Sequence, residues 1–200
     1  SFFVCRSLRI DKIMEKSQFS ATDLQRKIYV SGISGKRPAL PVDLNDLETA
    51  AQSVLTPEAF AYIAGGAGIG KTIENNRSAF DQWKILPRML RDVSERDTSI
   101  ELFGRKLPAP ILLSPVGVLD MAHKDADLAV AKAASSLGIP MIFSNQASRP
   151  MEACAEVMGD SPRWFQLYWS KSDELVASLV SRAENSGCDA IVVTLSLIHI

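Results

Sequence analysis

Apolar residues recur along the second half of the chain in short runs that have the length of buried strands. Between these runs, apolar residues stand three and four positions apart, which is the spacing of one helix face. The predicted strands cover residues 111–113, 141–143, 165–168 and 191–193, and the predicted helices cover residues 126–137, 150–158 and 175–183. Strands that alternate with helices form parallel sheets, so the pattern predicts an α/β fold of about four strand-helix units.

The third predicted strand carries two polar side chains at even spacing inside an apolar run. Alternate side chains of a strand face opposite ways. Trp164, Gln166 and Tyr168 therefore share one face, and Phe165, Leu167 and Trp169 share the other. A buried amide or phenol costs free energy unless it is hydrogen-bonded. The neighbouring backbone satisfies these groups if the strand is only structural; otherwise they belong to a site.

The first half of the chain predicts helices followed by a small hairpin. One helix begins behind Asp43, and a second begins at Thr56-Pro57-Glu58, where a hydroxyl stands at the N-cap and proline at the first helical position. This second helix ends at Gly65 and Gly66. A third helix covers about residues 72–80, and a hairpin that turns at Gly104 follows it.

These patterns predict four segments. They are an N-terminal arm (1–42), the helices with the hairpin (43–109), the strand-helix part (110–195) and a short tail (196–200). The chain does not begin with methionine, so we expect Met14 to be the true start. Residues 195–200 are what one reading frame of a common sequencing-library transposon end would encode, so we interpret the tail as foreign sequence.

The composition of the chain argues against several classes of protein and partner. The chain is 46% hydrophobic with a net charge of −1, which argues against a disordered protein and against nucleic acid as the main partner. Its apolar runs are shorter than the ~20 residues that a membrane span needs. Cys5, Cys154 and Cys188 show neither a disulfide framework nor the spacing of a metal site. A reducing, cytoplasmic location fits this cysteine usage best.

Residues 65–72 match the phosphate-loop pattern G-x-x-x-x-G-K-[ST]. A phosphate loop needs a buried strand before it, whereas here the preceding residues carry the signals of a helix start. No later predicted strand ends in an aspartate that would hold magnesium. We therefore favour a glycine-rich turn between two helices and keep nucleotide binding as the less favoured alternative.

Hydrogen-bonding groups gather where the predicted parallel strands end, which is where α/β folds place their ligands. They are Ser114 to Gly117 after the first strand, Ser144 to Gln146 after the second, Gln166 and Tyr168 in the third, and Thr194 at the end of the fourth. Gln166 can both donate and accept, which suits the edge of a heterocycle. Gly117 would let the backbone approach a flat ring closely. Each residue alone is more typical of a loop residue that caps the next helix, and it is their occurrence together on four successive strands that favours a site.

At these positions the sequence resembles the FMN-dependent 2-hydroxy acid oxidases and dehydrogenases, the family of glycolate oxidase and lactate oxidase. The resemblance runs from about Leu44 to Leu195, and its most specific stretches are residues 60–67, 74–77, 86–88, 114–115, 121–123 and 164–168. It implies the N-terminal half of a TIM (β/α)₈ barrel that holds FMN at the C-terminal mouth. Members carry a helix, a glycine-rich turn and another helix at the false phosphate loop. Within the family, Gly117 and the sequence Trp-Phe-Gln-Leu-Tyr-Trp of the third strand are most similar to lactate 2-monooxygenase.

The resemblance also implies roles for single residues. The backbone of Pro115, Val116 and Gly117 would face the reactive centre of the flavin, and Ser144, Gln166 and Thr194 would bind its ring system. Tyr62 would hold the substrate carboxylate, and Tyr168 would orient the substrate hydroxyl. The alternative for Tyr62 is a core aromatic residue, and we interpret His123 as a structural loop residue.

By this resemblance, the reaction is the oxidation of a small, lactate-like L-2-hydroxy acid, with oxygen or another electron acceptor. The family's catalytic histidine, its arginines and its phosphate site belong to the second half of the barrel and have no match here. A non-catalytic half-barrel that binds flavin or a partner is therefore the alternative function. Family members are often tetramers, so we expect a homo-oligomer at full length.

Overall fold

The computed structural model describes residues 21–38 and 40–195. The predicted start at Met14 and the predicted foreign tail lie outside the described residues. The chain divides into two compact units between Gly65 and Gly66. The segment boundaries at 42, 109 and 195 stay predictions.

The first unit is helical. Its described elements are α2 (Ala21–Ile33), the 3₁₀ turn η1 (Leu44–Asp46), α3 (Leu47–Gln52) and α4 (Pro57–Ala64). The Asp43 carboxylate accepts the N–H of Asn45 at 2.9 Å, and the Thr56 hydroxyl accepts the N–H of Ala59 at 3.2 Å. Both predicted helix starts are confirmed, because these side chains satisfy backbone donors that the first turn leaves free.

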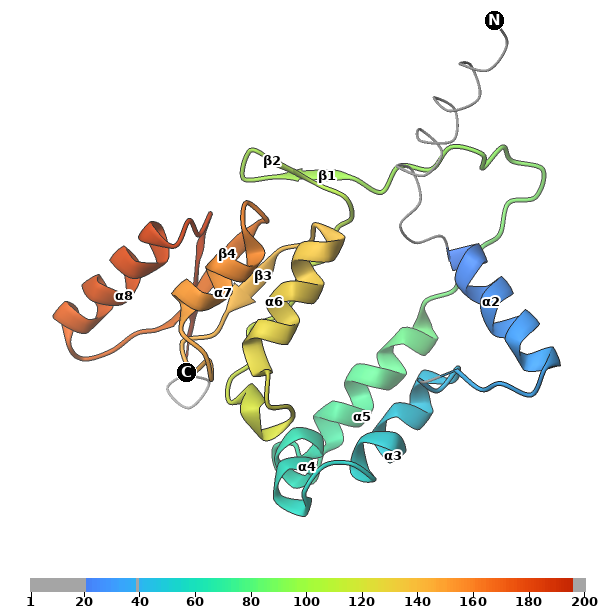
Figure 1. Ribbon diagram of the computed structural model, residues 1–200, viewed down its shortest axis with the longest axis horizontal. Helices are drawn as coiled ribbons and strands as arrows, with labels where there is room; N and C mark the ends of the chain where they lie inside the picture. Colours follow the sequence, from blue (N-terminus) through green and yellow to red (C-terminus); the bar gives the residue numbers. More distant parts are fainter. Residues whose placement is uncertain (1–20, 39, 196–200) are drawn as a thin grey trace, which may run out of the picture. The chain divides into compact units, whose positions relative to one another are not determined.

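The second unit contains a hairpin and a strand-helix alternation (Figure 1). Its elements are α5 (Lys71–Ser78), η2 (Ala79–Gln82), β1 (Ile100–Leu102), β2 (Arg105–Leu107), η3 (Leu119–Met121), α6 (Ala126–Leu137), β3 (Met141–Phe143), α7 (Met151–Met158), β4 (Arg163–Tyr168), α8 (Asp173–Asn185) and β5 (Ile191–Thr194). The helices and the hairpin agree with the predicted ones to within a few residues.

Strands β3, β4 and β5 form a parallel sheet in that order. Phe143 pairs with Phe165, which pairs with Ile191, so these three side chains share one face. The parallel arrangement brings the carboxyl ends of all three strands to the same edge. The predicted α/β class is confirmed.

The first predicted strand, residues 111–113, is not a strand. It forms only an isolated parallel bridge between Leu113 and Met141. Leu113 donates its N–H to the Pro140 carbonyl at 2.9 Å, and its own carbonyl accepts from Ile142 at 3.1 Å. Pro110 and Pro115 flank this bridge, and proline has no N–H to extend a ladder.

One face of the sheet carries the core, and helices α6, α7 and α8 pack on it (Figure 1). Phe143, Phe165 and Leu167 are each about 1% exposed and lie at its centre. The helices contribute mostly small or flexible side chains, namely Ala131, Ala134, Met151, Cys154, Met158, Val176 and Ala183. Full burial of a Phe or Leu side chain contributes roughly 1.5–3 kcal/mol each, so this cluster holds the three helices on the strands.

The hairpin is attached to the amino-terminal side of the strands. Arg105 pairs with Asp189 at 3.3 Å and donates to the Asp160 carbonyl at 3.0 Å. The ring centre of Phe103, at the hairpin tip, lies 5.2 Å from that of Trp164. These contacts cover the end of the sheet opposite the predicted site.

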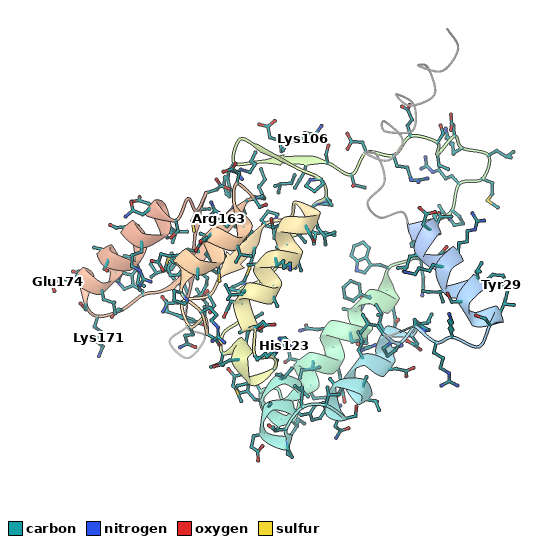
Figure 2. All side chains as sticks on the ribbon, viewed as in Figure 1. Tyr29, Lys106, His123, Arg163, Lys171 and Glu174 are labelled. Atoms are coloured by element: carbon teal, nitrogen blue, oxygen red, sulfur yellow. The ribbon has the colours of Figure 1, made fainter. Side chains whose placement is uncertain are left out.

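Arg163 joins the carboxyl ends of two helices at the start of β4 (Figure 2). Its Nε donates to the Ser186 carbonyl at 2.7 Å, and its Nη1 donates to the carbonyls of Ala155 at 3.1 Å and Gly159 at 2.6 Å. A cation is favourable where helix carbonyls are left free. By contrast, Lys171 and Glu174 point outward at the start of α8 (Figure 2).

No helix among the residues that the structure describes is long and apolar enough to cross a membrane.

Candidate functional site

Gln166 lies near the carboxyl end of the central strand β4 and is buried, with 2% of its surface exposed. Its register partner on β5 is Val192, so its side chain is on the face opposite the helix-packed core. The strand pattern in the sequence predicted this amide on the polar face. The structure buries it more deeply than is expected for a strand with one half-exposed face.

The Gln166 side chain has a defined orientation. Its Oε1 accepts the backbone N–H of Asn145 at 3.1 Å and lies 3.5 Å from the Ser144 hydroxyl. Because a backbone N–H must face an acceptor, this contact assigns the oxygen and nitrogen of the amide. Nε2 is buried without a hydrogen-bond partner among the described residues. The side chain therefore offers donors only, rather than the donor and acceptor expected from sequence.

The loop after β3 supplies the neighbours of Gln166. The Ser144 hydroxyl, almost fully buried, accepts the N–H of Gln146 at 3.1 Å. The Asn145 side-chain oxygen accepts the N–H of Tyr168 at 3.3 Å. Asn145 thus contacts β4 through both its backbone and its side chain. The sequence prediction placed Asn145 among the polar groups at the strand ends but gave only its neighbour Ser144 a role in cofactor binding.

Pro115, Val116 and Gly117 follow the single bridge at Leu113 and run beside that loop. Pro115 and Gly117 are half-buried, and Val116 is exposed. A Cβ on Gly117 would lie 3.2 Å from Cβ and 3.3 Å from the carbonyl oxygen of Gln146. The missing side chain of Gly117 therefore makes room for the neighbouring loop.

Tyr168 and Thr194 are register partners at the ends of β4 and β5, on the same face as Gln166. Tyr168 is 43% exposed and Thr194 is half-buried. The second unit thus brings Ser144, Gln166, Tyr168 and Thr194 to one edge of the sheet.

Tyr62 lies on α4 in the first unit, and 62% of its surface is exposed. This exposure does not support the alternative of a core aromatic residue. Because Tyr62 and the strands belong to different units, its predicted contact with the substrate stays a prediction.

Comparison with known proteins decides the family. The sequence profile described as FMN-dependent dehydrogenase matches residues 51–198. The chain belongs to this FMN-dependent dehydrogenase family. FMN is accordingly the cofactor to test against the site.

Curated relatives of this chain include an L-lactate oxidase from Lysinibacillus sphaericus. It is 40% identical over 171 residues, which are 86% of this chain and 44% of the relative. The human 2-hydroxyacid oxidase 1 is 40% identical over 151 residues, which are 76% of this chain and 41% of the relative. The chain therefore spans less than half the length of the curated relatives that it matches.

Solved structures agree with the sequence comparison. A crystal structure of mandelate oxidase superposes with a TM-score of 0.73 at 39% identity. The superposition covers 79% of this chain and 46% of the mandelate oxidase chain.

The residues at the sheet edge fit a flavin ring. Such a ring presents carbonyl oxygens and ring nitrogens in one plane, and Nε2 of Gln166 is a buried donor that has no hydrogen-bond partner among the described residues. A buried donor without an acceptor costs free energy, and a ligand acceptor removes that cost.

The phosphate-loop alternative loses its structural basis. The element before the loop is helix α4, which ends at Ala64, so the required strand is absent there. Lys71 is exposed and pairs with Glu74 one turn further along α5. Both features agree with the helix, turn and helix that the family resemblance implied.

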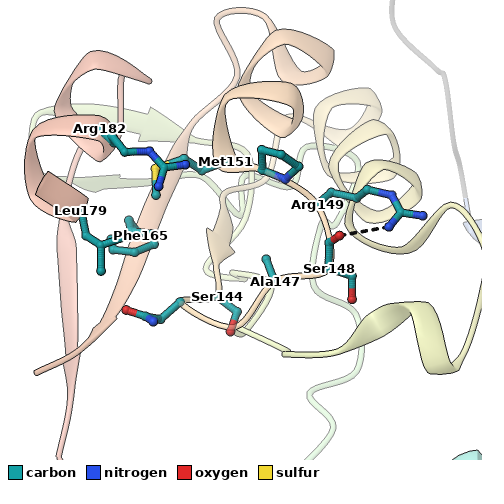
Figure 3. A pocket seen from close by; sticks show the side chains of 10 residues that line it. Ser144, Ala147, Ser148, Arg149, Met151, Phe165, Leu179 and Arg182 are labelled. Atoms are coloured by element: carbon teal, nitrogen blue, oxygen red, sulfur yellow. Dashed lines mark hydrogen bonds between the residues drawn. The ribbon is translucent and has the colours of Figure 1, made fainter. Parts of the chain in front are cut away.

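A cavity of about 330 Å³ lies between the loop after β3 and helix α8. Ala147, Ser148 and Arg149 line one side, and Phe165, Leu179 and Arg182 line the opposite side (Figure 3). Of the predicted cofactor contacts, only Ser144 lines it. Its two arginines are already bound, since Arg149 donates to backbone carbonyls and Arg182 pairs with Glu152.

The remaining candidate groups do not form a second centre within the described residues. No cluster of His, Cys, Asp and Glu in that part of the chain has the geometry of a metal site. His123 is exposed and its Nδ1 accepts the N–H of Asp125 at 3.1 Å. Burial raises the pKa of the Cys154 and Cys188 thiols to about 11 each.

Proposed function

We propose that the chain provides the flavin-binding face of an FMN-dependent 2-hydroxy acid oxidoreductase. The substrate is a small, lactate-like L-2-hydroxy acid, and the product is the 2-keto acid or its decarboxylated form. The observation that carries the proposal is the buried Gln166 amide, whose donors have no acceptor among the described residues while its oxygen is held by Asn145.

Gln166 acts as the central donor to the flavin ring. Its Nε2 would donate to a ring acceptor, and the Ser144 and Thr194 hydroxyls would bind the ring on either side of it. The backbone of Pro115, Val116 and Gly117 would lie beside the reactive part of the ring. Tyr168 is exposed at the strand end, where its phenol can orient a substrate hydroxyl.

Bound FMN would supply the hydride acceptor for oxidation at the 2-carbon of the substrate. In this proposal Tyr62 binds the substrate carboxylate and Tyr168 its hydroxyl, so that the reacting carbon is held in one orientation. The described sheet forms part of one half of a (β/α)₈ barrel. The general base, the carboxylate-binding arginines and the phosphate site then come from the part of the relatives that this chain does not match.

A cytoplasmic location, a homo-oligomer at full length and oxygen or another electron acceptor complete the proposal. The runner-up function is a half-barrel that binds flavin without turning over substrate. The two differ in one measurement on the full-length protein, since only the oxidoreductase bleaches bound flavin when L-lactate is added without oxygen.

FMN titration tests the proposal. We expect the chain to quench FMN fluorescence saturably, and Gln166→Met to weaken binding roughly tenfold, since it removes one hydrogen-bonding group of about 1.5 kcal/mol. Gln82→Met is the matched control, because Gln82 is exposed on η2. Equal FMN affinity of the chain and a folded Gln166→Met variant would refute the assigned site.

A further inference from the structure

A buried carboxylate holds the loop after β3. Asp127 lies near the start of α6 with 1% of its surface exposed. Its Oδ2 accepts the backbone N–H groups of Ser148 at 2.8 Å and Arg149 at 3.0 Å. Hydrogen bonds to a carboxylate are stronger than neutral ones, and burial excludes competing water. Residues 144–149, the site loop, are thus fixed at their far end.

The site loop is also locked to the segment after Leu113. Val118 donates its N–H to the Gln146 carbonyl at 3.0 Å. The Ser148 hydroxyl donates to the Asp120 carboxylate at 2.9 Å and accepts the Asp120 N–H at 3.1 Å. A Cβ at Gly117 would lie only 3.2 Å from Cβ of Gln146, so the two neighbouring loops are also closely packed. The hydrogen bonds and this close packing make them one interlocked piece.

The near end of the site loop determines where the Gln166 amide points. The Asn145 N–H donates to Gln166 Oε1, so a shift of the loop moves the acceptor side of the amide and with it Nε2. One short loop therefore connects the Asp127 carboxylate to the Gln166 amide, the proposed hydrogen-bond donor to the flavin.

The burial of Asp127 is unfavourable in free energy, because its second oxygen, Oδ1, is buried and has no hydrogen-bond partner among the described residues. An apolar residue would avoid this penalty. The charged side chain is therefore better explained by what its other oxygen holds than by packing in the core.

We propose that Asp127 is a positioning residue of the flavin site. It does not contact the ring; it fixes the site loop, so that the Gln166 amide presents its donors in one orientation. This inference rests on the proposed function, in which Gln166 donates to the flavin.

Two variants of the whole chain test it. Asp127→Ala removes the acceptor, whereas Asp127→Asn keeps the shape and one neutral acceptor. Asp160→Asn is the control, because Asp160 has an exposed side chain that makes no side-chain hydrogen bond or ion pair among the described residues. Circular dichroism verifies that each variant is folded.

The first readout needs no flavin. Hydrogen exchange of residues 144–149 should speed up in Asp127→Ala, by less in Asp127→Asn and not at all in Asp160→Asn. The second readout is FMN itself: Asp127→Ala should weaken binding roughly tenfold and shift the visible absorption of the bound flavin. A merely structural residue would lower stability without changing the flavin spectrum of the folded protein.

The outcomes separate the two proposals. If the parent chain does not bind FMN, the proposed function is wrong and the inference fails with it. If the parent binds and a folded Asp127 variant shows unchanged loop exchange, or unchanged FMN affinity and spectrum, the inference alone is wrong. Should Asp127→Ala fail to fold, the same criteria apply to Asp127→Asn.

Discussion

Replacing Arg163 by methionine should destabilise the second unit more than any exposed substitution. The guanidinium makes three hydrogen bonds to backbone carbonyls, two in or just after α7 and one just after α8. Methionine keeps the apolar stem but leaves these carbonyls without their charged donor. A hydrogen bond to a charged group contributes about 1.5–3 kcal/mol when buried, but water replaces part of it at this half-buried position. We therefore expect a loss of about 3 kcal/mol, a large share of a stability of roughly 5–15 kcal/mol.

Urea unfolding followed by circular dichroism measures this loss. The midpoint should fall while the slope of the free energy against urea stays unchanged, which identifies a change in stability rather than in the unfolded chain. Arg163→Lys is the matched variant: it keeps the positive charge near the helix ends, but one ammonium cannot replace the planar fork. It should lose an intermediate amount. A methionine variant within about 0.5 kcal/mol of the parent would refute this reading of the contacts.

Three further predictions concern other parts of the second unit. Cys154 and Cys188 should react slowly with iodoacetamide at pH 8 in the folded chain and rapidly in urea, because their raised thiol pKa values, about 11, leave little thiolate; fast reaction of the folded chain would contradict this. The hydrogen bond from Arg182 lowers the pKa of Glu152 below 4.5, so the pair stabilises the folded state at neutral pH, and this contribution disappears as acid protonates the carboxylate. Because the pair is exposed, Glu152→Gln should lower the free energy of unfolding by only ~0.5 kcal/mol at pH 7, as measured by urea unfolding. A loss above about 2 kcal/mol would be inconsistent with this prediction. Val193 is 46% exposed on the edge strand β5, so the chain should self-associate in light scattering and Val193→Lys should reduce this; a monodisperse monomer at high concentration would count against it.

Local signals in the sequence were sufficient for most elements of the fold. Thr56 and Pro57 mark the start of α4, because capping and the fixed backbone angle of proline act within one turn. The alternation in residues 163–168 gave the strand and its two faces. The strand predicted at residues 111–113 does not form, because the flanking prolines Pro110 and Pro115 lack the N–H groups that would extend the ladder. The apolar run on which the prediction rested does not take this effect into account.

The site was less accessible to sequence reasoning. Gln166 was found because a polar side chain inside a buried strand is unusual, but its orientation depends on Asn145, which is 21 residues away. Asp127 was missed because it looks like a favourable acid in the first turn of a helix. Its spacing of four and seven residues from the buried Ala131 and Ala134 was the available signal, since it puts a charge on the core face of α6.

The Gln166 side-chain amide gives the most direct test of the flavin site. In a ¹⁵N–¹H correlation spectrum, its NH₂ signals can be assigned by their loss in Gln166→Met. Addition of FMN should shift these signals downfield as Nε2 gains an acceptor, and the exposed Gln82 amide should stay in place. Saturable FMN binding that leaves the Gln166 amide signals unmoved would contradict the account.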